Sequence, residues 1–410
     1  MQIRDCDTKI GPCACGAWHN DYREKSKRSV WYFGLEPVKA RYTTQLSQEW
    51  MPATFTKYNS TINFIHVSGT SDPSEEIKVG AVLDAVGRGK FSLSQCANFL
   101  EMIRTDKVND GDIIMLQDFW TPGIESIFYA LDLYNIKNIK IYAMLHAQSV
   151  DEYDFTYLMR NWMRHYELGQ DKRMAGIFVG SSIHKEQLRA AGFTAPIHVV
   201  SLPIHKQLTI DVLPTYKELE KKDVVVYSSR LDKEKNPHFM MEVAKKFLVK
   251  YQWAEWHFTT SGKSIRSMLP GAVEAMYKLA KEQPRFKILT GLTKEEYYTE
   301  LATCRVQFNS SLQDYVSWTV IESTIFGADI VFPKFRSFPE FISEDRMYTP
   351  FDVTSAMKVI LAAFSAPRTH DYIGDISDMG RQLEAYIMVN DVTNELNVWH
   401  ETEYIKTLLK

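Results

Sequence analysis

The sequence has few cysteines, no long apolar run and little net charge. Its five cysteines are unevenly spread through 410 residues, which does not suit a disulfide framework. No segment reaches the roughly 18 apolar residues that a membrane-spanning helix needs, and the N-terminus lacks the apolar core of a signal peptide. A formal net charge of -3 gives no overall attraction to nucleic acid or to an anionic membrane. We therefore expect a globular cytoplasmic protein, monomeric or homodimeric, with no membrane partner.

Three of the cysteines lie near a histidine close to the N-terminus, at Cys6, Cys13, Cys15 and His19. This set could form a Cys3His zinc loop, but its Cys-x-Cys spacing is tighter than the usual Cys-x2-Cys. Ordinary reduced thiols are the favoured interpretation, and zinc stays an open alternative. We predict no metal site elsewhere in the chain.

Short apolar, β-rich runs alternate with helical stretches through the first half of the chain. This alternation is typical of parallel βαβ units, and nearly continuous apolar strands indicate that helices cover both faces of the sheet. The expected strands are 30–33, 62–67, 113–116, 139–144, 176–179 and 197–200. The expected helices are 41–55, 93–106, 123–134, 154–167 and 182–190.

A second alternating series follows a proline- and charge-rich linker at 203–222. Its expected strands are 223–228, 256–260, 286–289, 305–309 and 329–332, and its expected helices are 238–250, 270–282, 294–302, 317–326 and 353–366. The two series predict an α/β protein with two Rossmann-like domains, 1–205 and 210–390, facing across a cleft. Ligands in such sheets bind at the carboxyl ends of the strands.

Two cations, Arg230 and Lys235, follow the first strand of the second series. A guanidinium offers a planar fork for bidentate contact with phosphate, and Lys235 adds a point charge farther along the same loop. Cations placed here would stabilise the charge that a diphosphate leaving group gains in a transition state. Taken alone, the same residues are also typical of a solvated surface loop.

Two carboxylates, Asp314 and Glu322, lie eight residues apart, and Glu322 falls inside an expected helix. Ser317 and Trp318 begin that helix, and free backbone amides at a helix start suit a phosphate. Apolar neighbours indicate that the helix is buried, where an unpaired carboxylate is costly. We therefore expect Glu322 to accept hydrogen bonds from ribose hydroxyls, as carboxylates do in nucleotide-binding folds, rather than to lie on a helix surface.

Together these segments resemble the C-terminal half of family-4-type retaining glycosyltransferases, which have the GT-B fold of two Rossmann-like domains. The family pattern is Gly-Arg-Leu-x-x-x-Lys-Gly, then Glu-x7-Glu, then a Gly-x-Pro-Glu turn. Arg230, Lys235, Glu322 and residues 338–340 fall in register with it, within a stretch from 223 to 345.

The sequence departs from the family pattern at three places. Asp314 replaces the first glutamate and is one methylene shorter, Asn236 replaces the glycine after the lysine, and residues 315–317 replace a Gly-Phe-Gly stretch. These departures favour an unusual sugar or a divergent branch. They also leave open an inactive GT-B module that only binds its ligand.

The resemblance implies a nucleotide-sugar donor, most simply linked to UDP, held by the C-terminal domain without a metal. It implies that Arg230 and Lys235 meet the diphosphate and that Asp314 meets the sugar. Around the nucleotide it implies contacts from Glu322, Ser317, Trp318, Thr290, Gly291, Leu292 and Gly262. It also implies a closing helix, 395–410, that packs back on the N-terminal domain.

His146 follows an expected strand of the first half, within Leu145–Ser149. This segment resembles the His-x-x-Ser stretch of phage α-glucosyltransferases that modify hydroxymethylcytosine in DNA. The resemblance implies that His146 meets the donor sugar opposite the phosphates. The alternative is a histidine whose hydrogen bonds are satisfied within a strand-end turn.

Acceptor contacts are expected from the N-terminal domain. Arg88 and Lys90 lie in a glycine-containing cationic turn before an expected helix and suit a phosphate. Asp118 and Trp120, at a strand end, suit a sugar or a base, and residues 23–28 add a basic patch near aromatic side chains. Each of these groups is also common on a plain solvated surface.

The favoured acceptor is a hydroxylated base, such as modified cytosine in phage DNA, which would place the protein in the host cytoplasm. The alternatives are transfer to a lipid, a polysaccharide or a small molecule. A nucleotide-sugar epimerase on the same fold is a further alternative.

Overall fold

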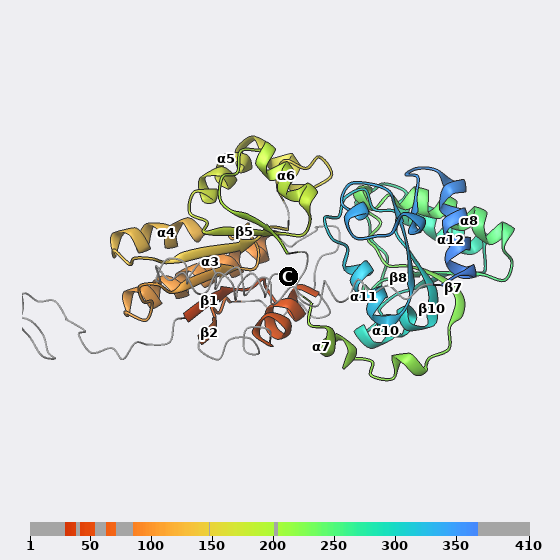
Figure 1. The fold of residues 1–410 in the computed structure, drawn as a ribbon, viewed down its shortest axis with the longest axis horizontal. Coiled ribbons are helices and arrows are strands. Elements are labelled where there is room, and N and C mark those ends of the chain that lie inside the picture. The colour runs from red at the N-terminus through yellow and green to blue at the C-terminus, as the bar shows by residue number, and fades with distance from the viewer. Residues whose placement is uncertain are drawn as a thin grey trace, which may run out of the picture.

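The computed structural model describes residues 29–37, 42–53, 63–70, 85–146, 148–200 and 204–367. Two lobes lie side by side, and the segment that includes helix α7 (Lys206–Ile210) connects them (Figure 1). The expected zinc loop, the basic patch at 23–28 and the closing helix 395–410 lie outside the described residues.

The first lobe contains a six-stranded sheet in the order β2-β1-β3-β4-β5-β6, with every pair parallel. Its strands are β1 (Ser29–Phe33), β2 (Asn63–His66), β3 (Ile113–Leu116), β4 (Lys140–Met144), β5 (Gly176–Val179) and β6 (Ile197–Val199). Its main helices are α1 (Tyr42–Gln45) with the π turn η1 (Leu46–Trp50), α3 (Ala85–Arg104), α4 (Ile124–Leu133), α5 (Arg160–Asp171) and α6 (Ser182–Ala190).

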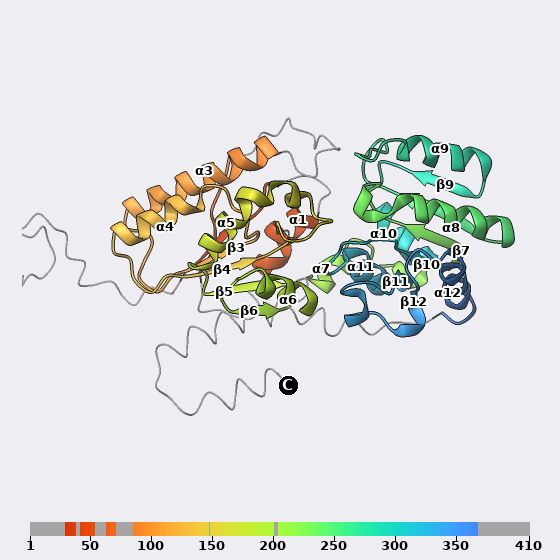
Figure 2. The same ribbon diagram turned by 90° about the horizontal axis from the view of Figure 1, so that it is seen from above.

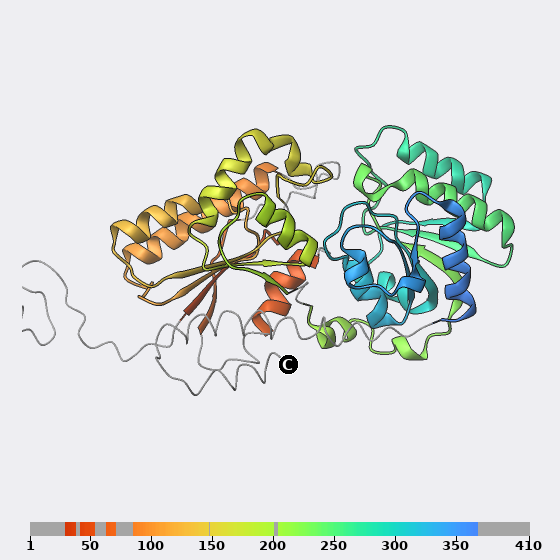
Figure 3. The same cartoon turned by 45° about the horizontal axis from the view of Figure 1, so that its top comes forward.

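Alternate residues of β1 belong to two different cores. Val30 and Tyr32 pack with Trp50 of η1 on one face of the sheet, whereas Trp31 and Phe33 pack with Phe99 of α3 on the other. α3 and α4 lie side by side (Figure 2). Figure 3 shows this helical layer, in orange and yellow, across the sheet from the red η1. Burial on both faces explains the continuous apolar strands.

The second lobe repeats the architecture, with a parallel sheet in the order β12-β11-β10-β7-β8-β9. Its strands are β7 (Lys222–Tyr227), β8 (Glu255–Thr259), β9 (Phe286–Leu289), β10 (Cys304–Phe308), β11 (Asp329–Pro333) and β12 (Met347–Tyr348). Its helices are α8 (Pro237–Lys250), α9 (Ala272–Glu282), α10 (Lys294–Thr303), α11 (Trp318–Phe326) and α12 (Val353–Ser365). All the expected strands are present within one residue of their predicted bounds, which confirms the α/β architecture of two Rossmann-like sheets.

The predicted turn at Arg88 and Lys90 is wrong. Both residues lie inside α3, which begins at position 85 instead of 93. Arg88 is buried, pairs with Glu36 at 3.3 Å and donates to the carbonyl of Trp120 at 3.2 Å. These contacts offset the cost of two helical glycines, about 1 kcal/mol each.

Two further expected elements differ in detail. The helix expected at 154–167 is a 3-10 turn, Phe155–Met159, followed by α5, because the Asp154 carboxylate accepts from the amide of Thr156 at 2.8 Å and caps the turn. The expected linker contains α7 and a short 3-10 turn, Tyr216–Glu218.

Candidate active site

The strand order of the second sheet reverses between β7 and β10, which are neighbours in space. Ligands in such sheets bind outside the carboxyl ends of the strands at this switch point. The loop after β7 carries Arg230 and Lys235, and the loop after β10 carries Asp314. The topology therefore brings the loop of Asp314 to the loop of Arg230 and Lys235, although Lys235 and Asp314 are 79 positions apart in sequence.

Lys235 ends the 3-10 turn Lys233–Lys235 and is buried. Asn236 follows in the left-handed conformation with a φ of 48°. The family has glycine at this position, and asparagine is among the residues that adopt this conformation most readily. The substitution therefore keeps the backbone turn that leads into α8.

The Lys235 ammonium donates to three oxygen atoms: Asp314 Oδ1 at 2.7 Å, Ser311 Oγ at 3.1 Å and the carbonyl of Gln313 at 3.1 Å. An ammonium has three N–H donors, so all are in use. Lys235 and Asp314 form one charge-assisted unit that joins the loops after β7 and β10. This contact holds Asp314 in place at the switch point.

Arg230 lies on the same loop as Lys235, and its side chain is 45% exposed. Its guanidinium contacts Asp232 at 3.0 Å and Glu234 at 2.8 Å, both on its own loop. The two carboxylates are only 14% and 15% exposed, so a phosphate at Arg230 has to compete with both of them for the guanidinium.

The other loop residues predicted to contact the nucleotide lie at the same edge of the sheet, after β8 and β9. Gly291, with a φ of 70°, donates its amide to the carbonyl of Gly262 at 2.7 Å. The amide of Leu292 donates to the carbonyl of Thr260 at 3.3 Å. These bonds hold the loop of Thr290, Gly291 and Leu292 against the loop of Gly262.

Glu322 lies in the second turn of α11 and is buried. Its carboxylate accepts from three side chains of α10: Lys294 at 3.2 Å, Tyr297 at 3.0 Å and Tyr298 at 3.3 Å. The sequence-based interpretation missed these donors. Lys294, Tyr297 and Tyr298 are spaced i, i+3 and i+4, which places three donors on one face of a helix. This spacing is the sequence pattern from which they could have been found.

Ser317 precedes α11 at the N-cap position without a side-chain capping hydrogen bond, and its Oγ lies 2.8 Å from the Thr319 hydroxyl. The Trp318 ring packs on Trp50 of the first lobe, with ring centroids 5.5 Å apart. The Trp318 side chain therefore contributes to the contact between the lobes. A phosphate contact at this helix start stays a prediction.

His146 lies at the end of β4 in the first lobe, where its Nε2 donates to the carbonyl of Gln117 at 2.9 Å. Nδ1 is then the basic ring nitrogen. Glu167, missed in the sequence, fixes the loop by accepting from the amide and the hydroxyl of Ser149 at 2.9 and 2.7 Å. Burial raises the pKa of Glu167.

Asp118 and Trp120 lie after β3 and are bound to each other, because Asp118 accepts from the amide of Trp120 at 3.2 Å. The Trp120 ring contacts Trp162 and Tyr166 of α5 at centroid distances of 5.6 and 4.9 Å. Asp118 also faces Asp154, whose pKa is raised to about 7 by burial and, less strongly, by neighbouring carboxylates.

No family model and no curated protein matches the chain. Solved structures do match. Sucrose-phosphate synthase from Thermosynechococcus elongatus superposes with a TM-score of 0.60 at 12% identity, over 89% of this chain and 97% of that one. The N-terminal domain of trehalose-6-phosphate phosphatase from Candida albicans gives 0.59 at 13% identity, over 90% and 97%. Anabaena HepE in complex with UDP and glucose gives 0.56 at 11% identity, over 90% and 99%.

The chain has the GT-B fold. At 11 to 13% identity these similarities concern the fold alone.

The two GT-B lobes meet at Tyr315, which stands in the stretch where the family has Gly-Phe-Gly. Its hydroxyl contacts Asp151 at 2.7 Å and Gln187 at 2.8 Å, and it accepts from the Gln148 amide. Its ring stacks on His184 with centroids 3.7 Å apart. Tyr315 therefore anchors the Asp314 loop to the other lobe.

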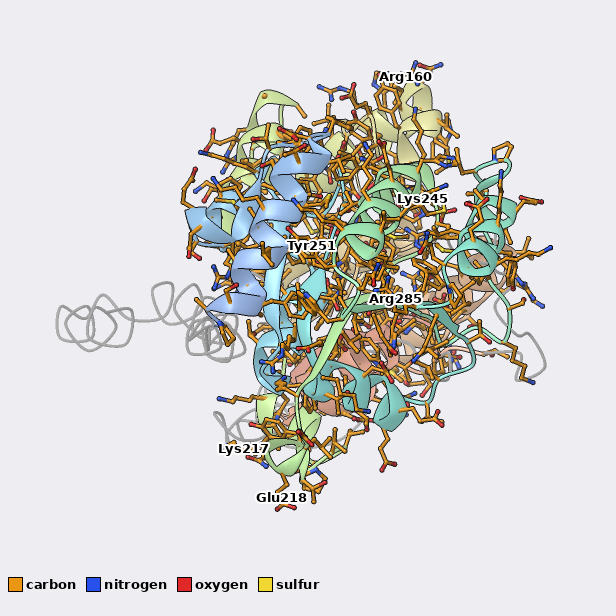
Figure 4. The ribbon with its side chains drawn as sticks, turned by 90° about the vertical axis from the view of Figure 1, so that its right-hand side faces the viewer. Arg160, Lys217, Glu218, Lys245, Tyr251 and Arg285 are labelled. Carbon is orange, nitrogen blue, oxygen red and sulfur yellow. The ribbon has the colours of Figure 1, made fainter. Side chains whose placement is uncertain are left out.

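A cavity of about 490 Å³ opens on the first GT-B lobe beside the loop of Ser149. Its lining is Ser149, Val150, Tyr157, Arg160, Asn161, Arg164 and His165. Arg160 stands at one edge of the molecule, and Lys217 and Glu218 of the linker stand at the opposite edge (Figure 4). This cavity offers the side chains of Arg160 and Arg164 to an anionic ligand. Of the two cations predicted to bind a phosphate, Arg88 is paired internally and Lys90 is exposed.

Among the residues that the structure describes, no group of three or more His, Cys, Asp or Glu side chains is arranged to hold a metal ion. Within the same part of the chain, no helix is long and apolar enough to span a membrane.

Proposed function

We propose that this protein is a retaining glycosyltransferase that moves a sugar from a nucleotide-sugar donor to an acceptor hydroxyl. The observation that carries the proposal is the contact of Lys235 with Asp314 at 2.7 Å across the switch point of the second sheet. It places a cation and a carboxylate where this fold binds ligands. A GT-B neighbour described in complex with UDP and glucose supports the donor class.

The donor would lie along the carboxyl edge of the second sheet. The base meets the backbone of Thr290, Gly291 and Leu292, and the nucleoside sugar meets Glu322. The diphosphate meets Arg230 and the start of α11. Lys235 meets it by exchanging its bond to the Ser311 hydroxyl or to the Gln313 carbonyl for one to a phosphate oxygen. UDP is the simplest nucleotide for these contacts.

The reaction needs no nucleophile from the protein. The acceptor oxygen bonds to the anomeric carbon on the face from which the diphosphate leaves, and the acceptor proton passes to a phosphate oxygen. Arg230 and Lys235 stabilise the charge on the leaving group. Asp314 orients sugar hydroxyls, and His146 contacts the sugar from the first lobe.

The proposed acceptor is a hydroxylated base in phage DNA. Exposed Lys90 and the cavity with Arg160, Arg164 and His165 offer phosphate contacts. Trp120 and Trp162 provide aromatic surfaces on which a base can stack. All of these residues belong to the first lobe, which leaves the second lobe to the donor.

The test is transfer from labelled nucleotide-sugars to DNA that contains hydroxymethylcytosine, beside unmodified DNA, lipid and oligosaccharide acceptors. Label in the modified DNA alone supports the whole proposal. Label only in a lipid or an oligosaccharide overturns the DNA acceptor and keeps the transferase. Nucleotide binding with no turnover of any donor would indicate an inactive module.

A further inference from the structure

The Glu322 carboxylate has little hydrogen-bonding capacity left for a ligand. Oε1 accepts from the Lys294 ammonium at 3.2 Å and from the Tyr298 hydroxyl at 3.3 Å. Oε2 accepts from the Tyr297 hydroxyl at 3.0 Å. A carboxylate has about four acceptor positions, two on each oxygen. Three are filled, and the remaining one is on Oε2.

The surrounding structure holds these donors in place. The Glu322 side chain is only 5% exposed, and the α11 residues on either side of it are buried. Tyr298 is buried and stacks on Phe326 with centroids 4.4 Å apart. The Lys294 ammonium also lies 5.7 and 5.3 Å from the ring centroids of Tyr297 and Tyr298, a favourable cation–π distance.

A ribose has two adjacent hydroxyls, and a carboxylate that binds both needs one free position on each oxygen. Oε1 has none, so a second hydroxyl would have to displace Lys294 or Tyr298. Displacing Tyr298 leaves a buried hydroxyl without its partner, and displacing Lys294 gives up a charge-assisted bond, so either exchange offsets the benefit of the new bond. The geometry of Glu322 therefore suits one hydroxyl.

We propose, on the basis of the proposed function, that the donor site binds the nucleoside through a single sugar hydroxyl. A 2′-deoxyribonucleoside diphosphate sugar is then accepted about as well as its ribose counterpart. Lys294 is the donor that keeps a second hydroxyl from binding Oε1. Its side chain is 23% exposed, so its removal frees a position on Oε1 with the least disturbance of the core.

The test is calorimetric titration of the full-length protein with UDP and with 2′-deoxy-UDP, which share a base and differ in one hydroxyl. The wild type is expected to bind the two within about threefold of each other. Lys294→Met is expected to bind UDP about tenfold more tightly than 2′-deoxy-UDP, as one recovered charge-assisted hydrogen bond implies. Lys246→Met, an exposed substitution on α8, is the matched control and should behave as the wild type.

A wild-type preference of tenfold or more for UDP overturns the inference and leaves the transferase proposal standing. Equal binding of both nucleotides by Lys294→Met, with the variant folded as judged by its melting temperature, overturns the role of Lys294. If neither of these nucleotides nor any guanosine, adenosine or cytidine pair binds, the donor site itself is wrong and both proposals fail.

Discussion

Arg336 of the second lobe holds Asp151 of the first lobe in an ion pair, with Nη1 2.8 and 2.7 Å from the two carboxylate oxygens. Asp151 is fully buried and also contacts the Tyr315 hydroxyl. Arg336 has a φ of 47°, which is uncommon for a residue with a side chain. Close by, the Glu340 carboxylate accepts from the amides of Ser182 and Ile183 at the start of α6. The lobes are thus joined by charges as well as by aromatic rings.

Replacing Arg336 with Met should destabilise the protein by about 3–5 kcal/mol, because Asp151 would be left buried without its cation. Urea unfolding measures the loss, and small-angle scattering should show a larger radius of gyration as the lobes separate. Adding Asp151→Asn should recover part of the stability. A double variant less stable than the single one would contradict the assigned pairing.

Acidification should weaken the contact between the lobes at Tyr315, because the Tyr315 ring stacks on His184. Burial, with a smaller effect of His146, lowers the pKa of His184 to about 3, against 6.5 ordinarily. Between these values the unfolded chain binds a proton that the folded chain does not, so the contribution of His184 to stability falls as pH falls. This contribution falls by about 2 kcal/mol between pH 7.5 and pH 5. Asp154, with its pKa raised to about 7, acts in the opposite sense.

The His184→Phe variant keeps a ring against Tyr315 and removes the titrating nitrogen. Its stability relative to the wild type should therefore improve by about 2 kcal/mol between pH 7.5 and pH 5 in urea unfolding. The exposed histidine at 165 provides the matched control, His165→Phe, for which no such gain is expected. A parallel pH dependence in wild type and His184→Phe would exclude His184 as the source.

Arg230→Ala should lower turnover tenfold to a hundredfold and cost some stability, because the guanidinium is 45% exposed but its partners Asp232 and Glu234 are only 14% and 15% exposed. Lys235→Met should lower turnover and also destabilise the fold, because Asp314 loses its buried cation. Lys233→Ala, an exposed change on the same turn, is the control for both. Wild-type rates in the Arg230 and Lys235 double variant would refute the assigned roles.

Activity should persist in EDTA, because Arg230 and Lys235 supply the charge that a metal supplies in other transferases. Initial rates with and without EDTA, and with added Mn²⁺ or Mg²⁺, measure this. Strict dependence on a divalent ion would show that the two cations do not neutralise the diphosphate.

Binding to hydroxymethylated DNA should fall steeply with salt, because each phosphate contact releases counterions. Lys90→Ala with Arg160→Ala should reduce the salt slope by about two and leave donor hydrolysis unchanged. Substitution of Arg88 is a poor test, because this residue holds Glu36 and Trp120. Lys217→Ala, at the edge of the molecule opposite Arg160 (Figure 4), is the control. An unchanged slope in the double variant would place the DNA elsewhere.

The strands could be predicted closely because buried parallel strands are continuous apolar runs between turn residues. The family pattern assigned Lys235 and Asp314 to one donor site, but it did not predict their ion pair. Local sequence does not give the order of strands that brings the two loops together. The start of α3 was misplaced because its glycines argue locally for a turn. The contacts of Arg88 that override them come from Glu36 and Trp120, 52 and 32 residues away.

The hydrogen-bond partners of Glu322 likewise could not be predicted from local sequence. Burial showed that it needs a partner, and ribose was the natural expectation. Its partners in the structure belong to a different helix, α10, whose packing against α11 depends on the tertiary fold.

Tyr315 gives the protein a property that glycine at this place would not provide. Asp314, next to it, is tied to Lys235, while Tyr315 itself is bound to the first lobe. Separation of the lobes must therefore pull on the Asp314 loop, which we propose to contact the donor. We expect the spent nucleotide to leave only when Tyr315 parts from Asp151, so that the rate of this event limits how fast the protein can turn over.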